Sequence, residues 1–215
     1  MIEIKHKQTG EVLLRTEKDN LEGVNLTGAN LAGADLTGQD ISHACLRSVD
    51  LHGAVMNGAQ LVGTCLDEAN LADASLDGAD LTDATLRKAD LHHAHMEKCN
   101  LRYTKLTGAN LSDAFLEGAD LSMADARADL HHADLHHADL RGANLTGANL
   151  QEADLGDANL TGATMNRAVI KGARTQGAKL AGVIQDEQLA SAETQARAQM
   201  LRRNNTGFQA DGSAN

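Results

Sequence analysis

A five-residue repeat runs through most of this 215-residue chain. From Asp19 to Gly182 the sequence divides into 33 consecutive units of the form A-(D/N)-L-x-x, one of which is a residue short. Leu occupies the central place of 26 units, and Ala occupies the place two residues earlier in 26. Self-similarity of this kind indicates a repeat architecture, in which each unit packs only against its neighbours.

The spacing within each unit predicts a very short strand followed by a bend. Ala and Leu are two residues apart, so in an extended backbone both point inward and the Asp or Asn between them points outward. Gly is frequent at the last place, where it permits the positive φ that a tight corner needs. At the central place Ile41, Met56, Met96, Met165 and Ile170 preserve the volume of Leu, whereas Ala126 and Thr175 do not.

These units resemble those of the pentapeptide-repeat family. In that family four units make one turn of a right-handed quadrilateral β-helix, with the central Leu or Phe and the small residue inside. The resemblance therefore implies an all-β solenoid of about eight coils over residues 19–182. At a strand spacing of about 4.8 Å, the coils make a rod of about 40 Å.

A solenoid needs both ends covered, because open coils expose strand edges and core residues. Residues 2–15 alternate apolar and polar on both sides of Gln-Thr-Gly, which predicts a β-hairpin cap within residues 1–18. Residues 183–203 are rich in helix formers and predict a C-terminal capping α-helix, followed by a disordered tail over 204–215. The alternative is that this helix pairs with a second copy to form a homodimer.

The repeat slips once. Leu121 is followed by a central place at Ala126, and the next centre arrives at Leu130, one residue early. Unit 124–127 lacks its last residue. We expect a dent or bulge there, because the pattern resumes cleanly; a kinked hinge is the alternative.

Composition and charge exclude several classes of protein. The formal net charge is -11, which disfavours direct nucleic-acid binding because phosphate recognition needs clustered Lys and Arg. Three Cys and the lack of a secretory leader at the start of the sequence favour the reducing cytoplasm. No apolar run approaches the roughly 18 residues of a membrane span.

Wrapping the sequence at four units per turn places residues 20 apart, or 19 across the deletion, on one face. One face then carries Asn30, Asp50, Asn70, Asp90, Asn110, Asp129 and Asn149, and the opposite face carries Asn20, Asp40, Gln60, Asp80, Asn100 and Asp120. Amide and carboxylate alternate along each face. Two carboxylates on adjacent rungs, that is on successive coils, would repel each other by about 0.9 kcal/mol, and the amides between them limit this repulsion. The candidate interaction surface is therefore Asp40, Asp50, Asp80, Asp90, Asp120 and Asp129.

Cys45 and Cys65 fall on adjacent rungs, where a disulfide is geometrically allowed but disfavoured in a cytoplasm.

Histidine doublets stack against carboxylates in the same wrapping. On one face the last places of successive coils are Asp73, His93, Asp113, His132 and Glu152. The places just before them include His52, His92 and His131. On the next face His136 falls beside Glu117, and His137 falls beside Asp157. A solvated surface ladder explains this pattern. The alternative is a divalent metal held by His93, Asp113 and His132, with His92 or His131. Fixed rung spacing matches tetrahedral geometry poorly, so such binding would be adventitious.

A leucine-filled rod offers neither a cavity nor long loops, and the sequence contains no catalytic triad, phosphate loop or paired zinc-type Cys motif. We therefore expect a non-catalytic interaction or scaffold protein with no cofactor and an unidentified protein partner. The family resemblance implies a second hypothesis, an acidic mimic of DNA that binds gyrase and confers fluoroquinolone resistance. The acidic surface is interrupted, however, by Arg47, Arg87, Lys88, Lys98, Arg102, Lys105 and Arg127, and no unit has a central Phe. A structural spacer with no ligand is the third hypothesis.

Overall fold

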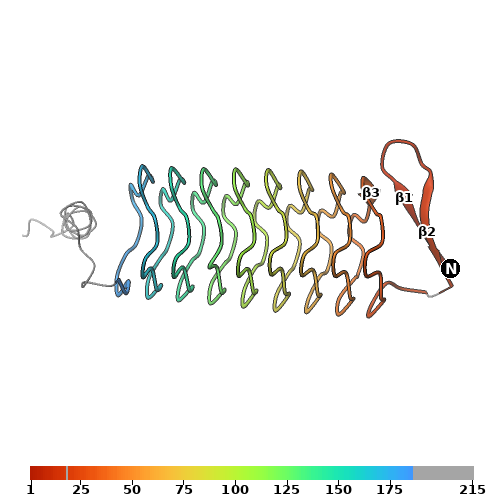
Figure 1. The fold of residues 1–215 in the computed structure, drawn as a ribbon, viewed down its shortest axis with the longest axis horizontal. Helices are drawn as coiled ribbons and strands as arrows, with labels where there is room; N and C mark the ends of the chain where they lie inside the picture. The colour runs from red at the N-terminus through yellow and green to blue at the C-terminus, as the bar shows by residue number, and fades with distance from the viewer. Residues whose placement is uncertain (18, 186–215) are drawn as a thin grey trace, which may run out of the picture.

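The computed structural model describes residues 1–17 and 19–185. The repeats form a single stack of coils along the long axis of the molecule (Figure 1). The larger part of the predicted C-terminal helix, residues 186–203, lies outside the described residues, as do the predicted tail over 204–215 and the homodimer contact assigned to that helix.

Parallel β-bridges join each repeat to the repeat one coil later. On one face they run from Asn25↔Cys45 to Thr164↔Ile184 in eight steps. Three further ladders pass through Asn30↔Asp50, Asp35↔Val55 and Asp40↔Gln60. The four faces are named below by their first residues, Asn25, Asn30, Asp35 and Asp40. A coil therefore contains four units, as the wrapping of the sequence predicts, and the fold is an all-β solenoid.

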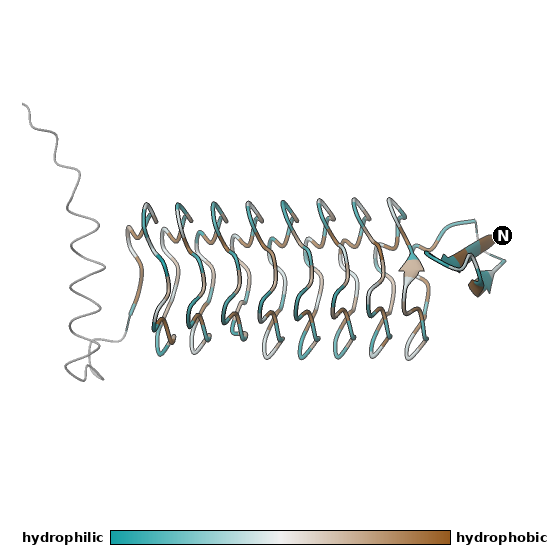
Figure 2. Cartoon of the chain, turned by 90° about the horizontal axis from the view of Figure 1, so that it is seen from above, coloured by the Kyte–Doolittle hydropathy of each residue, from teal (hydrophilic) through white to brown (hydrophobic). Residues whose placement is uncertain are grey.

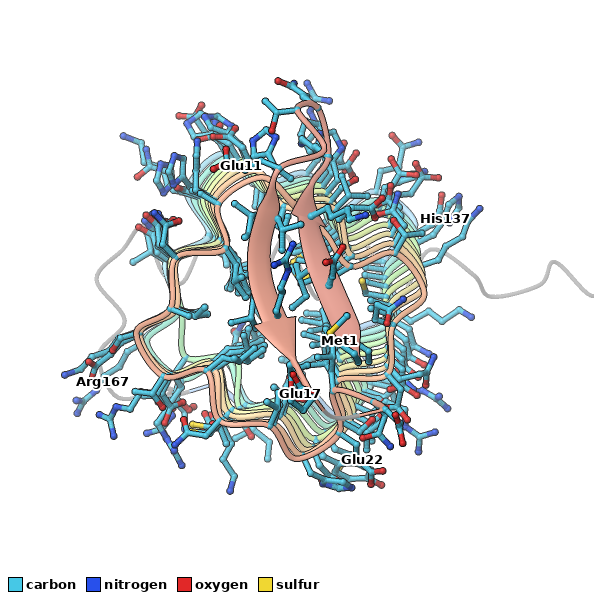
Figure 3. The ribbon with its side chains drawn as sticks, turned by 90° about the vertical axis from the view of Figure 1, so that its right-hand side faces the viewer. Met1, Glu11, Glu17, Glu22, His137 and Arg167 are labelled. Carbon is cyan, nitrogen blue, oxygen red and sulfur yellow. The ribbon has the colours of Figure 1, made fainter. Side chains whose placement is uncertain are left out.

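The interior is filled by the central residue of each unit and by the small residue two places before it. Leu71 and Leu91, for example, are fully buried, as is Ala74. Where a buried residue two places before the centre carries a polar group, a backbone carbonyl accepts from it: the Thr64 hydroxyl donates to Ile41 O over 3.0 Å and the Cys99 thiol to Leu76 O over 2.7 Å. The view down the axis shows the square outline and the side chains on both sides of the wall (Figure 3).

Each corner of a complete five-residue unit is a tight turn with its third residue in the left-handed region. In the corner Leu51–Ala54, the Ala54 N–H donates to Leu51 O over 2.9 Å, and Gly53 has φ +60°. Every last place from Gly23 to Gly182 has positive φ, and sixteen of these places hold residues other than Gly. The positive φ at the third turn residue alone is the type II pattern.

Two strands cover the first coil. β1 (Ile2–His6) and β2 (Val12–Thr16) form an antiparallel hairpin, and β1 also pairs with β3 (Ala34–Asp35) of the first coil. Ile4 is 2% exposed and belongs to the core. The hairpin crosses the end of the stack (Figures 1 and 3).

The shortened unit 124–127 changes one corner only. It lacks the left-handed residue, and the Ala128 N–H donates instead to Ala126 O over 2.9 Å. On all four faces, the β-bridges that cross the deletion join residues nineteen positions apart in the sequence, and the spacing returns to twenty at Asp129↔Asn149. Because the coils on both sides stay paired throughout, the stack is continuous here (Figure 2). The deletion is absorbed as a local tightening.

Candidate functional site

The Asp or Asn before each central residue has a structural task as well as an outward position. Its Oδ1 accepts a hydrogen bond from the backbone N–H two residues later: the Ala32 N–H donates to Asn30 over 3.1 Å and the His136 N–H to Asp134 over 3.0 Å. This Asx turn satisfies a backbone donor that enters the corner. The repeat pattern predicts only an outward position for these residues, but the preference of Asp and Asn for turns could have predicted this bond as well.

On the Asn30 face the amides and carboxylates form a connected column. Nδ2 of Asn70 donates to Oδ1 of Asp50 on the coil before it, over 3.0 Å. The same bond joins Asn110 to Asp90 and Asn149 to Asp129, each over 3.0 Å. The side chains of Asp90 and Asp129 are 44% and 43% exposed. The face therefore presents fixed carboxylates on alternate rungs.

The opposite Asp40 face lacks these cross-rung amide bonds among the described residues. Gln60 Nε2 donates instead to Gly58 O at 3.5 Å. The alternation also fails farther along, because Asp120 pairs directly with Asp139. Arg141 compensates: its Nη2 lies 2.6 Å from Asp139 Oδ2. Burial raises the pKa of Asp139, but the hydrogen bonds from Arg141 outweigh it, so the pKa lies below its ordinary value.

Four of the ten histidines, His52, His92, His131 and His132, pair with nearby carboxylates. Nδ1 of His92 lies 2.9 Å from Asp90 Oδ1, and Nδ1 of His131 lies 2.8 Å from Asp129 Oδ1. Burial raises the pKa of Asp90, but the hydrogen bonds from the His92 ring and backbone outweigh it and hold the pKa below its ordinary value. Two of the doublet histidines are thus part of the Asn30 column.

The structure brings together a different trio of metal ligands from the one considered in the sequence. Within residues 1–17 and 19–185, the group with three donor atoms all within 4.8 Å of one another is His136, His137 and Asp157. His93, Asp113 and His132 occupy last places on three successive rungs. Two rung steps span roughly 9.6 Å, which is why these three do not form such a group.

The thiols fall into two environments. Cys45 and Cys65 are bridge partners, half-buried and free. The Thr27 hydroxyl, 3.2 Å from Cys45 Sγ, leads the contacts that lower the pKa of that thiol. Burial raises the pKa of Cys99 to about 12.

The described surface offers little enclosure. A shallow, open depression is lined by His132, Asp134, Glu152, Asp154, Gly172 and Arg174. His132 Nε2 lies 3.8 Å from Glu152 Oε2, and Arg174 Nη1 lies 3.5 Å from Asp154 Oδ2. Its groups are thus engaged in ion pairs with one another. The described residues contain no helix that is long and apolar enough to cross a membrane.

Comparison with known proteins agrees with this geometry. The family model for pentapeptide repeats matches eight copies, in overlapping segments that together run from residue 20 to residue 184. The chain belongs to the pentapeptide-repeat family. No curated protein sequence matches it.

Solved structures of pentapeptide-repeat proteins resemble the chain. HetL, described as involved in heterocyst differentiation regulation in the cyanobacterium Nostoc sp. strain PCC 7120, is 32% identical, with 81% of this chain and 94% of HetL covered and a TM-score of 0.48. Full-length QnrB1, a plasmid-mediated fluoroquinolone resistance protein, is 21% identical, with 84% and 97% covered and a TM-score of 0.40. A second Nostoc pentapeptide-repeat protein, alr5209, is 38% identical over 50% of this chain and 84% of its own, with a TM-score of 0.24.

Proposed function

We propose that this pentapeptide-repeat protein is a non-catalytic interaction or scaffold module that presents its Asn30 face to a basic region of a protein partner. We take the solenoid to be a right-handed quadrilateral β-helix of about eight coils, as in its family. Free thiols fit the reducing cytoplasm as its location. The proposal includes no cofactor and no direct contact with nucleic acid or a membrane.

The connected column on the Asn30 face carries the proposal. Oδ1 of Asp50, Asp90 and Asp129 is held by an amide of the next rung. Among the described residues, the hydrogen bonds and ion pairs of these three carboxylates all use Oδ1, which leaves Oδ2 to accept an N–H of Lys or Arg. The three carboxylates recur roughly every 9.6 Å along a rigid wall. Preorganised charges of this kind set specificity and association rate.

Asp-to-Asn variants test the proposal without removing the Asx turns, because Asn keeps the Oδ1 acceptor. The test variant carries Asp50→Asn, Asp90→Asn and Asp129→Asn. The matched control carries Asp40→Asn, Asp80→Asn and Asp120→Asn, the same change of charge on the opposite face.

Each protein is used as bait in an extract of the source cells, and bound proteins are identified by mass spectrometry. We expect a partner that the wild type and the Asp40-face control capture and the Asn30-face variant does not. Capture that survives the Asn30-face changes would contradict the assignment of this face.

Mimicry of DNA toward gyrase or another DNA-binding protein is the second candidate, favoured by the net charge of -11. Duplex DNA carries one charge per roughly 1.7 Å of axis, however, while the Asn30 column carries one per roughly 9.6 Å. On the Asp40 face, Arg141 pairs with Asp139 and further reduces the acidic field. A supercoiling assay decides: micromolar protein that leaves gyrase activity unchanged removes this candidate.

A further inference from the structure

The three histidine doublets have the same local sequence but different geometry. Each lies in the segment Ala-Asp-Leu-His-His-Ala, beginning at Ala89, Ala128 and Ala133. The ring centroids are 5.3 Å apart in the first two doublets, His92–His93 and His131–His132. In His136–His137 they are 4.1 Å apart. Because the local sequence is shared, the difference comes from the neighbouring coil.

The residue one coil later decides where the first ring of each doublet lies. Ser112 follows His92 and Gln151 follows His131, and both of those rings turn to the carboxylate of their own unit. Gly156 follows His136, and a Cβ on Gly156 would collide with Nδ1 of that ring. The absent side chain thus gives the His136 ring a place against the backbone of the next coil. The backbone N–H of His136 donates to the Asp134 carboxylate, but among the described residues its ring makes no hydrogen bond to that carboxylate.

Asp157 completes the arrangement from the same adjacent coil. It follows His137 by one coil, and a Cβ on Gly177, one coil farther on, would collide with its carboxylate. Both outer residues are held by corner backbone, with φ +58° at His137 and +54° at Asp157. His137 lies on the outside of the square wall, where an ion from solvent can reach it (Figure 3).

We propose that His136, His137 and Asp157 bind one divalent transition-metal ion of the zinc class. Two imidazoles and a carboxylate suit Zn²⁺ and its neighbours rather than Mg²⁺ or Ca²⁺. The donors lie within 4.8 Å of one another, and ligands about 2.1 Å from a tetrahedral ion are about 3.4 Å apart. Small rotations of the half-buried His136 and the exposed His137 and Asp157 side chains close that gap. The fourth position is left to water, and the ion clamps two consecutive coils together.

Zinc titration of the full chain, free of any polyhistidine tag, tests the site by calorimetry and by the absorption spectrum of bound Co²⁺. We expect one equivalent in the wild type and a rise in Tm with added Zn²⁺, because the ion binds only the folded state. His136→Gln and Asp157→Asn should each weaken binding at least tenfold. Gly156→Ala, which changes no ligand, should do the same by displacing the His136 ring.

The matched control is the double variant His92→Gln, His131→Gln, which removes the same chemistry from the other two doublets. It should bind zinc as the wild type does. The proposal is overturned if Asp157→Asn binds one equivalent with unchanged affinity, or if the wild type binds several weak equivalents that the control variant reduces in proportion. Far-ultraviolet circular dichroism of each variant verifies that the coil stack is intact.

Discussion

The side-chain amide of Asn110 donates to the carboxylate of Asp90 on the preceding coil, over 3.0 Å. Asn110→Asp would delete this donor and place a carboxylate one rung from both Asp90 and Asp129. We expect a loss of about 1 to 2 kcal/mol in the free energy of unfolding, part of which is recovered in high salt. Thermal melts at low and high ionic strength measure both components.

Asn100→Asp on the Asp40 face is the control for this prediction. Asn100 lies between Asp80 and Asp120 in its ladder, so the new charge repels equally, but among the described residues its amide makes no cross-rung bond. Its loss of stability should be smaller and almost wholly salt-dependent. Equal losses in both variants would show that the Asn110–Asp90 bond contributes nothing.

The ladders could be predicted from the sequence because the fold is nearly one-dimensional. Once Leu and Ala fix which residues point inward, four units per coil determine every neighbour, and the bridges Asp50↔Asn70 and Asn70↔Asp90 follow. The same wrapping, continued across the deletion on the Asp40 face, also gives the break in alternation at Asp120↔Asp139.

Side-chain direction could not be predicted in the same way. Identical segments place His131 against its own Asp129 and leave His136 beside His137. The difference depends on whether the next coil offers a Cβ, as at Gln151, or none, as at Gly156. The spacing already places His137 one coil from Asp157. It does not determine the side-chain rotamers that bring the donor atoms of His136, His137 and Asp157 within 4.8 Å of one another.

The last place of each unit requires the left-handed conformation even where the sequence has no Gly. Asp83 has φ +58° there, and Gly78 has φ +66° with nothing within 4 Å of an added Cβ. Asp83→Gly should therefore stabilise the protein by up to about 1 kcal/mol, and Gly78→Ala should destabilise it by about 1 kcal/mol. Denaturant midpoints compare the two. Changes of the same sign in both variants would contradict the backbone argument.

The two thiol environments predict two rates of chemical labelling. Cys45 and Cys65 are half-buried, and the Thr27 hydroxyl leads the contacts that lower the pKa of Cys45. Cys99 is buried, and burial raises its pKa to about 12. A disulfide-exchange reagent at pH 8 should modify two thiols of the native protein quickly and Cys99 only at the rate of unfolding. Cys99→Ala should remove the slow phase alone.

The small residue at the shortened corner should be coupled to the deletion. Ala126 is fully buried at a place where most units carry Leu. Ala126→Leu should overpack the tightened corner and cost about 1 to 3 kcal/mol. With one Gly inserted after Arg127 to restore the unit, the same substitution should cost at least 0.5 kcal/mol less. A double-mutant cycle measures this coupling, and strict additivity would separate the residue from the deletion.

Low pH should destabilise the folded protein by protonating Asp125, which pairs with Arg127 at the same corner. Nε and Nη2 of Arg127 donate to its two carboxylate oxygens, each over 2.6 Å. The Thr107 hydroxyl adds a third bond over 3.0 Å. The bonds from Arg127 lead the causes that hold the pKa of Asp125 below its ordinary value of 3.8, against the opposing effect of burial.

Because the pKa of Asp125 is lower in the folded state, the ionised group stabilises the protein above about pH 4. That contribution is lost as the pH falls through the lowered pKa. Asp125→Asn should reduce Tm by a few degrees at pH 7, a modest effect because Arg127 is partly exposed. The difference from the wild type should shrink steadily from pH 4 to pH 2 in melts at constant ionic strength. A difference that stays constant over this range would mean that Asp125 contributes packing and neutral hydrogen bonds, and that its charge does not stabilise the corner.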